Sequence, residues 1–540
     1  MKLKFLFSLL VAGALTASAQ GYKDGVEYFK ADQLSNAKTL LERNLGTATA
    51  PEDKALAYYY LGAINVHEKD FTAARKNFEQ GLAANPNSAL NKVGLGELAL
   101  MQGEQKVAEG YFDEAKKINK KDAEVLTAIG RAYFNTDPVK YAKEIEKYDQ
   151  QAFKANKNEP SIFVLRGDRE AANKEWGDAA ANYENAILYS KGLPEAYVKY
   201  ANAYFNVNPD FAIAKLQELL QENPTSALGQ RELAEKYYQN DQWAMAAKAY
   251  GDYIKNPNHF EEDEIRYTVL LYYGQHYDES LEIANRLLAK NPDNMQLLRI
   301  AFLDKAALKD YPAAEVAAEK LFALKNAKAD FSSLDYSTYA EVLQELGKDS
   351  LAIGAYEKAI EINPEKGDLY KALSSAYSGA KNYDKALEVF QSFIDRGDYV
   401  TNDLVTLASR YQNVAATSEE GSEKKMNAIN KAIETISQVA EKVPDNPIPV
   451  RNKARMMLVK YDNKPSQEMV DTYMQVVELL DKDPENKTKR ADMYNEAYSQ
   501  IASFYISEKD IPNAKVYYEK VYELDPTNQA LRDYIDNKLK

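Results

Sequence analysis

Cysteine is absent from the 540-residue sequence, and histidine and tryptophan are rare, with three and two residues respectively. The lack of cysteine excludes disulfide bonds, thiolate metal sites, thiol catalysis and lipid attachment through an N-terminal cysteine. Acidic residues outnumber basic ones, and the formal net charge is −14. This balance argues against a broad basic face, so the sequence predicts no nucleic-acid partner.

Motifs that carry catalysis or bind cofactors are also missing. There is no Gly-x-x-x-x-Gly-Lys-Ser/Thr phosphate loop, no Gly-x-Gly-x-x-Gly motif and no Gly-x-Ser-x-Gly nucleophile elbow. His67 lacks the second histidine of a zinc-protease helix, and His259 beside the acidic run at 261–263 is better explained as a solvated acidic turn than as a metal site. We therefore predict no catalytic residue, no metal site, no cofactor and no enzymatic activity.

Long apolar runs are limited to the N-terminus. Residues 1–19 begin with Lys2 and Lys4, continue as an apolar stretch at 5–15 and end in small residues. This order is typical of a secretory signal peptide cleaved after Ala19, with an uncleaved anchor as the alternative. We expect an exported protein, periplasmic or extracellular, with no transmembrane segment in the mature chain. Peripheral association with a membrane complex is compatible with this expectation.

What the sequence does have is a period. Asn-Pro, Asp-Pro or an equivalent pair closes successive stretches along the whole chain. The intervals from Pro86 to Lys120, from Pro224 to Pro257 and from Pro257 to Pro292 are 34, 33 and 35 residues. A repeated unit of about 34 residues is the length of one tetratricopeptide repeat.

Positions inside the period follow one pattern. In the unit that ends at Pro86, Gly62 lies in a first predicted helix, Asp70 marks a turn, and Ala74 and Phe78 lie in a second helix. The same types recur at equivalent positions, including Gly96, Ala108 and Phe112; Gly167, Ala179 and Tyr183; Ala340, Ala352 and Tyr356; and Ala502, Ala514 and Tyr518. The sequence resembles the tetratricopeptide repeat family throughout the mature chain. That resemblance implies an all-α, right-handed superhelical solenoid of about 14 antiparallel helix pairs.

The regularity of the repeats varies along the chain. We predict a regular array of about 11 repeats at 20–400, looser repeats with insertions at 401–526 and a C-terminal capping helix at 527–540. The largest insertion is expected at 416–425. The segment 443–449 contains three prolines and is the best candidate for a hinge.

The resemblance also implies where partners bind. In this family the first helix of each pair lines a concave groove, and its outward-facing positions contact ligands. Carried onto this sequence, those positions give the candidate binding residues Tyr59, Val93, Glu97, Arg131, Phe134, Val198, Asn202, Phe205 and Asn206. This mixture of apolar and amide side chains suits an extended peptide or a helix, although the apolar ones could instead line the inner wall of a tight superhelix.

The function predicted from the sequence is that of a non-enzymatic scaffold for partner proteins or peptides in the bacterial cell envelope. A binding module for a glycan or another non-protein ligand is the alternative, because the 40 tyrosines offer rings on which sugars could stack. Tyrosines clustered on one open face would favour that alternative.

Overall fold

The computed structural model describes residues 21–119, 121–324, 331–461 and 464–540. The predicted signal peptide at 1–19 lies outside these ranges. Within them the regular structure is helical, with no strand. The chain divides into two compact units, Met1–Lys290 and Asn291–Lys540, which we call unit 1 and unit 2.

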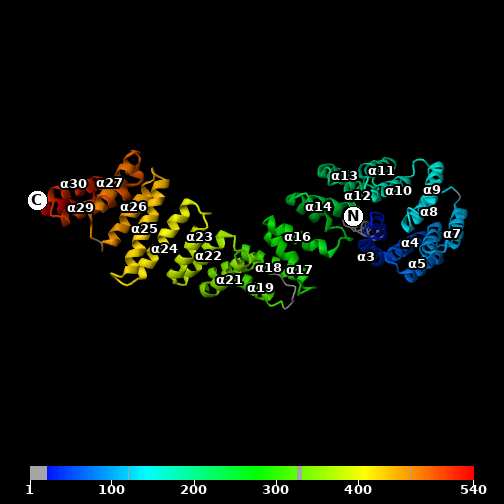
Figure 1. The fold of residues 1–540 in the computed structure, drawn as a ribbon, viewed down its shortest axis with the longest axis horizontal. Helices are drawn as coiled ribbons and strands as arrows, with labels where there is room; N and C mark the ends of the chain where they lie inside the picture. The colour runs from blue at the N-terminus through cyan, green and yellow to red at the C-terminus, as the bar shows by residue number, and fades with distance from the viewer. Residues whose placement is uncertain (1–20, 120, 325–330, 462–463) are drawn as a thin grey trace, which may run out of the picture. The chain divides into compact units, whose positions relative to one another are not determined.

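Unit 1 contains eight pairs of helices that follow one another in sequence (Figure 1). The described elements are α2 (Gly21–Lys30), α3 (Leu34–Asn44), the 3-10 helix η1 (Leu45–Thr47), α4 (Pro51–His67), α5 (Phe71–Ala84), α6 (Ala89–Met101), α7 (Gln105–Ile118), α8 (Ala123–Thr136), α9 (Ala142–Ala155), α10 (Pro160–Ala172), α11 (Trp176–Tyr189), α12 (Pro194–Tyr204), α13 (Pro209–Glu222), α14 (Ala227–Gln239), α15 (Trp243–Tyr253), α16 (Glu261–Tyr273) and α17 (Tyr277–Leu288).

Unit 2 continues the same alternation. Its described helices are α18 (Met295–Ala307), α19 (Tyr311–Phe322), α20 (Ser333–Glu345), α21 (Asp349–Ile362), α22 (Gly367–Gly379), α23 (Tyr383–Asp395), α24 (Thr401–Thr417), α25 (Glu423–Lys442), α26 (Pro447–Lys460), α27 (Gln467–Asp481), the short α28 (Asn486–Lys489), α29 (Ala491–Ser507), α30 (Ile511–Leu524) and α31 (Gln529–Lys538).

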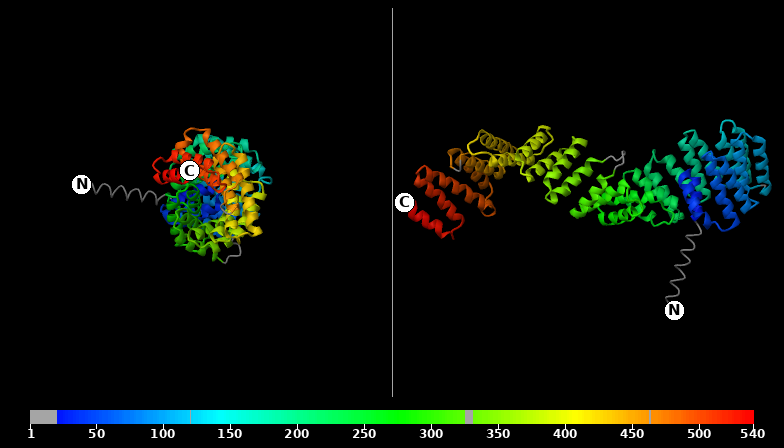
Figure 2. Two further views of the ribbon diagram at one scale, coloured as in Figure 1. Left: turned by 90° about the vertical axis from the view of Figure 1, so that its left-hand side faces the viewer. Right: turned by 90° about the horizontal axis from the view of Figure 1, so that it is seen from below.

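Helices adjacent in sequence pack as hairpins, from α2–α3 to α29–α30, and Figure 2 shows successive hairpins stacked side by side within each unit. We call the two members of each hairpin its first and second helix. The predicted all-α solenoid of antiparallel helix pairs is confirmed.

The turn inside each hairpin has a recurrent local cause. After α4, Lys69 adopts a positive φ of 63°, and the Asp70 carboxylate then accepts a hydrogen bond from the Ala73 amide at 3.0 Å, which caps α5. The left-handed residue ends the first helix and the capped N-terminus begins the second. Positive φ recurs two residues before a second helix at Asp32, Gly103, Lys174, Asp241, Gln275, Lys309, Gly347, Lys381 and Lys509.

Stacking between hairpins depends on aromatic rings pressed against glycine. Phe78 of α5 is completely buried. A Cβ on Gly62 of α4 would lie 2.5 Å from the Phe78 ring, and one on Gly94 of α6 would lie 2.3 Å from it. The ring therefore fills a space that exists only because both neighbouring first helices carry glycine there. Phe112 and Tyr183 each press against one glycine, Gly96 and Gly167 respectively.

Some sequence expectations concern the C-terminal part. The predicted insertion at 416–425 is divided between the two helices and the turn that joins them, because α24 ends at Thr417 and α25 begins at Glu423. The predicted hinge at 443–449 contains the start of α26 at Pro447, and the predicted capping segment contains α31. The border between the compact units falls at Lys290 and Asn291, beside the Asn291-Pro292 pair that closes a repeat. The predicted division near residue 400 stays a prediction.

Substituting Gly94 by alanine tests the ring-on-glycine packing. The added Cβ would overlap the Phe78 ring, so we expect Gly94→Ala to lower the free energy of unfolding of unit 1 by about 1–3 kcal/mol. Urea unfolding followed by tryptophan fluorescence measures this, because both tryptophans, Trp176 and Trp243, lie in unit 1.

Gly110→Ala is the matched control. Gly110 lies inside α7, and a Cβ there would meet no atom within 4 Å. We expect this change to leave stability unaltered or to raise it by up to about 1 kcal/mol, because alanine favours a helix over glycine. Equal effects of the two substitutions would contradict the proposed packing.

Candidate functional site

The candidate residues predicted from the sequence lie in unit 1, on α4, α6, α8 and α12 or, for Phe205 and Asn206, directly after α12. Their exposure differs widely. Val93, Glu97 and Val198 are buried, Asn202 and Asn206 are exposed, and the half-buried members are Tyr59, Arg131, Phe134 and Phe205.

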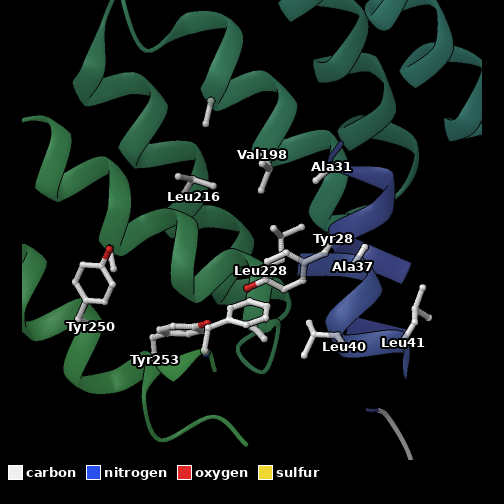
Figure 3. Close-up of a cluster of buried hydrophobic side chains, with 14 of the residues drawn as sticks. Tyr28, Ala31, Ala37, Leu40, Leu41, Val198, Leu216, Leu228, Tyr250 and Tyr253 are labelled. Atoms are coloured by element: carbon white, nitrogen blue, oxygen red, sulfur yellow. The ribbon is translucent and has the colours of Figure 1, made fainter. Parts of the chain in front are cut away.

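Val198 is buried by the beginning of the chain itself. Helix α2 packs against both α12 and α14, although about 170 residues separate it from α12 in sequence. Figure 3 shows Val198 and Leu228 on the side of these helices that faces Tyr28 and Ala31 of the first hairpin, and all four belong to one buried apolar cluster. The Tyr28 ring also meets the Phe260 ring edge to face at 5.5 Å. The first hairpin therefore covers part of the face on which a ligand was expected.

Polar side chains border this apolar contact, and we call them the seam. Gln33 donates to the Glu232 carboxylate at 2.5 Å, and the Ser226 hydroxyl donates to Glu27 at 2.7 Å. The Lys30 ammonium lies 3.5 Å from Glu195. The seam thus joins α2 and the turn after it to α12 and to the start of α14.

A second part of the seam lies before α16. The Asn258 amide donates to Asp24 of α2 at 2.5 Å and accepts from Asn44 of α3 at 3.0 Å. Asn258 is buried, with an exposed fraction of 5%. The first hairpin is therefore held by three successive hairpins of unit 1, which closes this part of the array on itself.

A buried ionic network continues inward from the seam. Lys199 of α12, 6% exposed, donates to Asp32 in the turn after α2 and, at 2.8 Å, to Asp168 of α10. Asp168 also accepts from Arg131 at 2.6 Å and from the Tyr183 hydroxyl at 2.9 Å. Although burial opposes ionisation of Asp168, Arg131 and Lys199 hold its pKa below the ordinary value. The candidate Arg131 is therefore engaged within the protein.

Tyr59 and Glu97 also contact other side chains of unit 1. The Tyr59 ring lies 4.9 Å from Tyr60 and 6.1 Å from Phe78, measured between ring centroids. Glu97 accepts a hydrogen bond from Asn135 at 2.9 Å, and burial raises the pKa of Glu97 to about 7. Burial also raises the pKa of Tyr59, with the nearby Glu97 as a second cause. These side chains form a packed polar interior, and of the nine candidates Asn202 and Asn206 remain exposed.

Removing the central cation tests the importance of the network. Lys199→Met would leave Asp168 buried with one cation fewer, so we expect unit 1 to lose about 3 kcal/mol of unfolding free energy. Urea unfolding by tryptophan fluorescence measures the loss. Lys255→Met is the control, because the Lys255 pair with Asp252 is exposed and should contribute less than about 0.5 kcal/mol. Similar losses for both variants would show that the network contributes little.

Unit 2 contains a pocket that the sequence reasoning missed. Its volume is about 650 Å³, and it lies between α19, α20 and α21. Four half-buried aromatic rings form one wall: Phe322 at the end of α19, Phe331 before α20, and Tyr336 and Tyr339 of α20. The Phe322 ring stacks on Tyr336 with centroids 4.8 Å apart.

The opposite side of the pocket is open and carries charge at its rim. Gly354 of α21 lines it, and a Cβ there would meet no atom within 4 Å. Lys358, one turn further along α21, places its ammonium 5.4 Å above the Tyr336 ring. Among the described residues neither Lys358 nor Glu319, on the α19 side, forms an ion pair.

A sequence signal for this pocket did exist. The aromatic residues Phe322, Phe331, Tyr336 and Tyr339 lie close together in the sequence, at the end of one hairpin and the start of the next. This local concentration of aromatic residues, rather than the repeat pattern, was the signal.

The described part of the chain contains no group of three or more His, Asp or Glu side chains that could hold a metal ion. His259 contacts Glu264 at 2.9 Å and the Asn256 carbonyl at 2.7 Å, rather than the acidic run at 261–263. None of the described helices is both long enough and apolar enough to cross a membrane.

Comparison with protein families matches three parts of the chain to tetratricopeptide repeat models, at residues 53–123, 336–366 and 496–528. These matches cover less than half of the chain. The first match spans α4 to α7, which form the Phe78 packing, and the second spans most of α20 and α21, which line the pocket. No curated protein matches the sequence.

Solved tetratricopeptide-repeat structures resemble parts of the chain. The C-terminal part of a repeat-containing protein from Cytophaga hutchinsonii has 23% identity and a TM-score of 0.41, covering 50% of this chain and 98% of its own. YrrB, described as having an unusual peptide-binding site, has 17% identity and a TM-score of 0.30, and the match covers 37% of this chain and 100% of YrrB. A structure of Cut9 with Hcn1 has 14% identity and a TM-score of 0.26, and the match covers 97% of this chain and 99% of the other chain. Tetratricopeptide-repeat proteins are generally non-catalytic scaffolds for protein–protein interaction.

Proposed function

We propose that the protein is a non-enzymatic scaffold that binds partner proteins or peptides, and that the pocket between α19 and α21 is one of its binding sites. The observation that carries this proposal is the combination of an open aromatic wall with a charged rim that forms no ion pair among the described residues. Its volume of about 650 Å³ lies within the usual range of ligand sites, which is about 300–1,000 Å³.

The surroundings of the pocket favour a peptide side chain as the occupant. Ala323, Leu343, Leu351 and Ala355 supply aliphatic wall around the rings. Leu351 is 60% exposed at the rim, and Val316 of α19 is also exposed, one turn before Glu319. Helices α19 and α21 thus each present an exposed apolar residue, and such residues accommodate the apolar face of a partner helix. Lys358 would then meet an acidic residue of that partner.

A glycan is the second candidate, and the half-buried aromatic rings favour it. A sugar presents hydroxyl groups over most of its surface, and these groups need hydrogen-bond partners when they are buried. The pocket wall offers mainly aromatic and aliphatic side chains, with Glu319 and Lys358 at the rim. The peptide is therefore the better chemical match, and the experiment below separates the two.

Filling the pocket should abolish binding without unfolding the repeat. Gly354→Leu projects a side chain into the open space, and leucine favours a helix more than glycine does. We expect the variant to lose at least about 2 kcal/mol of binding free energy, roughly 30-fold in affinity. The measurement is capture of partners in cells by a photo-crosslinking residue at position 351, followed by mass spectrometry and by titration of the identified partner.

The matched control is Gly177→Leu, because Gly177 of α11 is also an exposed helical glycine with no atom within 4 Å of a Cβ. Capture that persists in Gly354→Leu would exclude this pocket as the binding site. Failure to capture any protein, together with a glycan that copurifies with the parent chain and is lost in Gly354→Leu, would favour the second candidate.

We further propose that the scaffold works in the bacterial cell envelope, on the basis of the signal-like segment at 1–19. Sequencing of the N-terminus of protein recovered from the periplasmic fraction tests this. The expected result is a mature chain that begins at Gln20. An unprocessed chain that stays in the cytoplasmic fraction would contradict the proposed location.

A further inference from the structure

The contact between the first hairpin and α12–α16 differs in kind from the contacts that build the array. Neighbouring hairpins follow one another in sequence, whereas the first hairpin meets α12 and α14 across about 170 residues of sequence, through the apolar cluster of Tyr28 and Val198 that the seam borders. A solenoid is normally stabilised by contacts between adjacent repeats alone. Losing this distant contact would therefore leave every adjacent contact of unit 1 in place.

The seam also buries carboxyl groups against neutral partners. Glu27 faces the Ser226 hydroxyl before α14, Glu195 of α12, and Asp24 and Lys30 of its own helix. Burial is the main cause that raises the pKa of Glu27 to about 8. The negative charge of an ionised Glu27 would be poorly stabilised here, because its hydrogen-bond donor, Ser226, is uncharged and Lys30 is paired with Glu195.

Asp24 is in a similar position at the other end of α2. It faces the Asn258 amide before α16 and lies near Arg43 of α3. Burial raises the pKa of Asp24 to about 6, against the lowering effect of both neighbours. When the pKa of a carboxyl group is higher in the docked state, its protonated form favours docking. This favourable free energy is complete at a pH below the ordinary pKa, and it is lost as the pH rises through the raised pKa.

We propose that the first hairpin, α2–α3, is a reversible seal that can leave α12–α16 while the rest of unit 1 stays folded, and that ionisation of Glu27 promotes its release. In the closed state Val198 and Leu228 are completely buried beneath it. In the open state these side chains become an apolar surface bordered by Lys199 and by the carboxyl groups of Glu195 and Glu232. The position of the α2–α3 hairpin therefore controls access to this face of α12 and α14.

A single engineered thiol can report the opening, because the protein contains no cysteine. Val198→Cys places the thiol under the seal, and Val93→Cys places one at an equally buried position of α6 in the same unit. The rate of modification by a maleimide, normalised for the ionised fraction of each thiol, is measured at pH 6 and pH 8.

The expected result is faster modification at position 198 than at position 93, with the ratio about tenfold larger at pH 8 than at pH 6. Adding Glu27→Gln, which keeps the side chain neutral, should lower the pH 8 ratio to the pH 6 value. Equal rates at the two thiols, both matching global unfolding, would overturn the seal. A pH effect that Glu27→Gln leaves unchanged would overturn the assignment to Glu27.

Hydrogen exchange of the unsubstituted protein provides a second measurement that needs no thiol. If the seal exists, backbone amides of α2 and α3 in the parent chain exchange faster than those of α8. In the Glu27→Gln variant at pH 8, the α2 and α3 amides exchange more slowly than in the parent chain. Uniform exchange of α2, α3 and α8 would overturn the proposal even if the cysteine variants failed to fold.

Discussion

The stacking of hairpins in unit 1 depends on buried aromatic rings that press against glycines of the first helices. Phe78 fills the space that Gly62 and Gly94 leave open on two successive first helices, and Phe112 and Tyr183 each press against one glycine, Gly96 and Gly167. A ring in this position fixes both the distance between helices and the stacking of one hairpin on the next. Because the contact involves only neighbours, the array is built from locally determined steps.

Stacking several hairpins in this way brings the first hairpin of unit 1 into contact with helices that are distant in sequence, and no single repeat determines this contact. In unit 1 the hairpins return the first pair to α12, α14 and the residues before α16, where Tyr28 meets Phe260 and Asp32 meets Lys199. The face that would bind a partner thereby becomes partly internal. Unit 2 keeps an open pocket at Tyr336 and Lys358. The two units therefore offer binding surfaces of different accessibility.

The sequence was sufficient for the helix pairs because their signals are local. Gly62, Ala74 and Phe78 recur at fixed offsets, and a turn such as Lys69-Asp70 is determined by the residues that form it. The covering of Val198 could not be predicted in this way, since it depends on a small rotation per repeat summed over several hairpins. The pocket escaped prediction for another reason: its wall joins Phe322 of α19 with Phe331 and Tyr336, and the repeat pattern does not specify that these rings meet.

The central structural claim is the closure of unit 1 by its first hairpin, and crosslinking tests it most directly. Asn44 and Asn258 are 214 residues apart in sequence, yet their side-chain amides are hydrogen bonded at 3.0 Å. In the cysteine-free chain, thiols introduced as Asn44→Cys and Asn258→Cys can be joined by a short bifunctional reagent. The account predicts rapid crosslinking within one chain at low protein concentration. No crosslink under those conditions, or crosslinks only between chains, would contradict it.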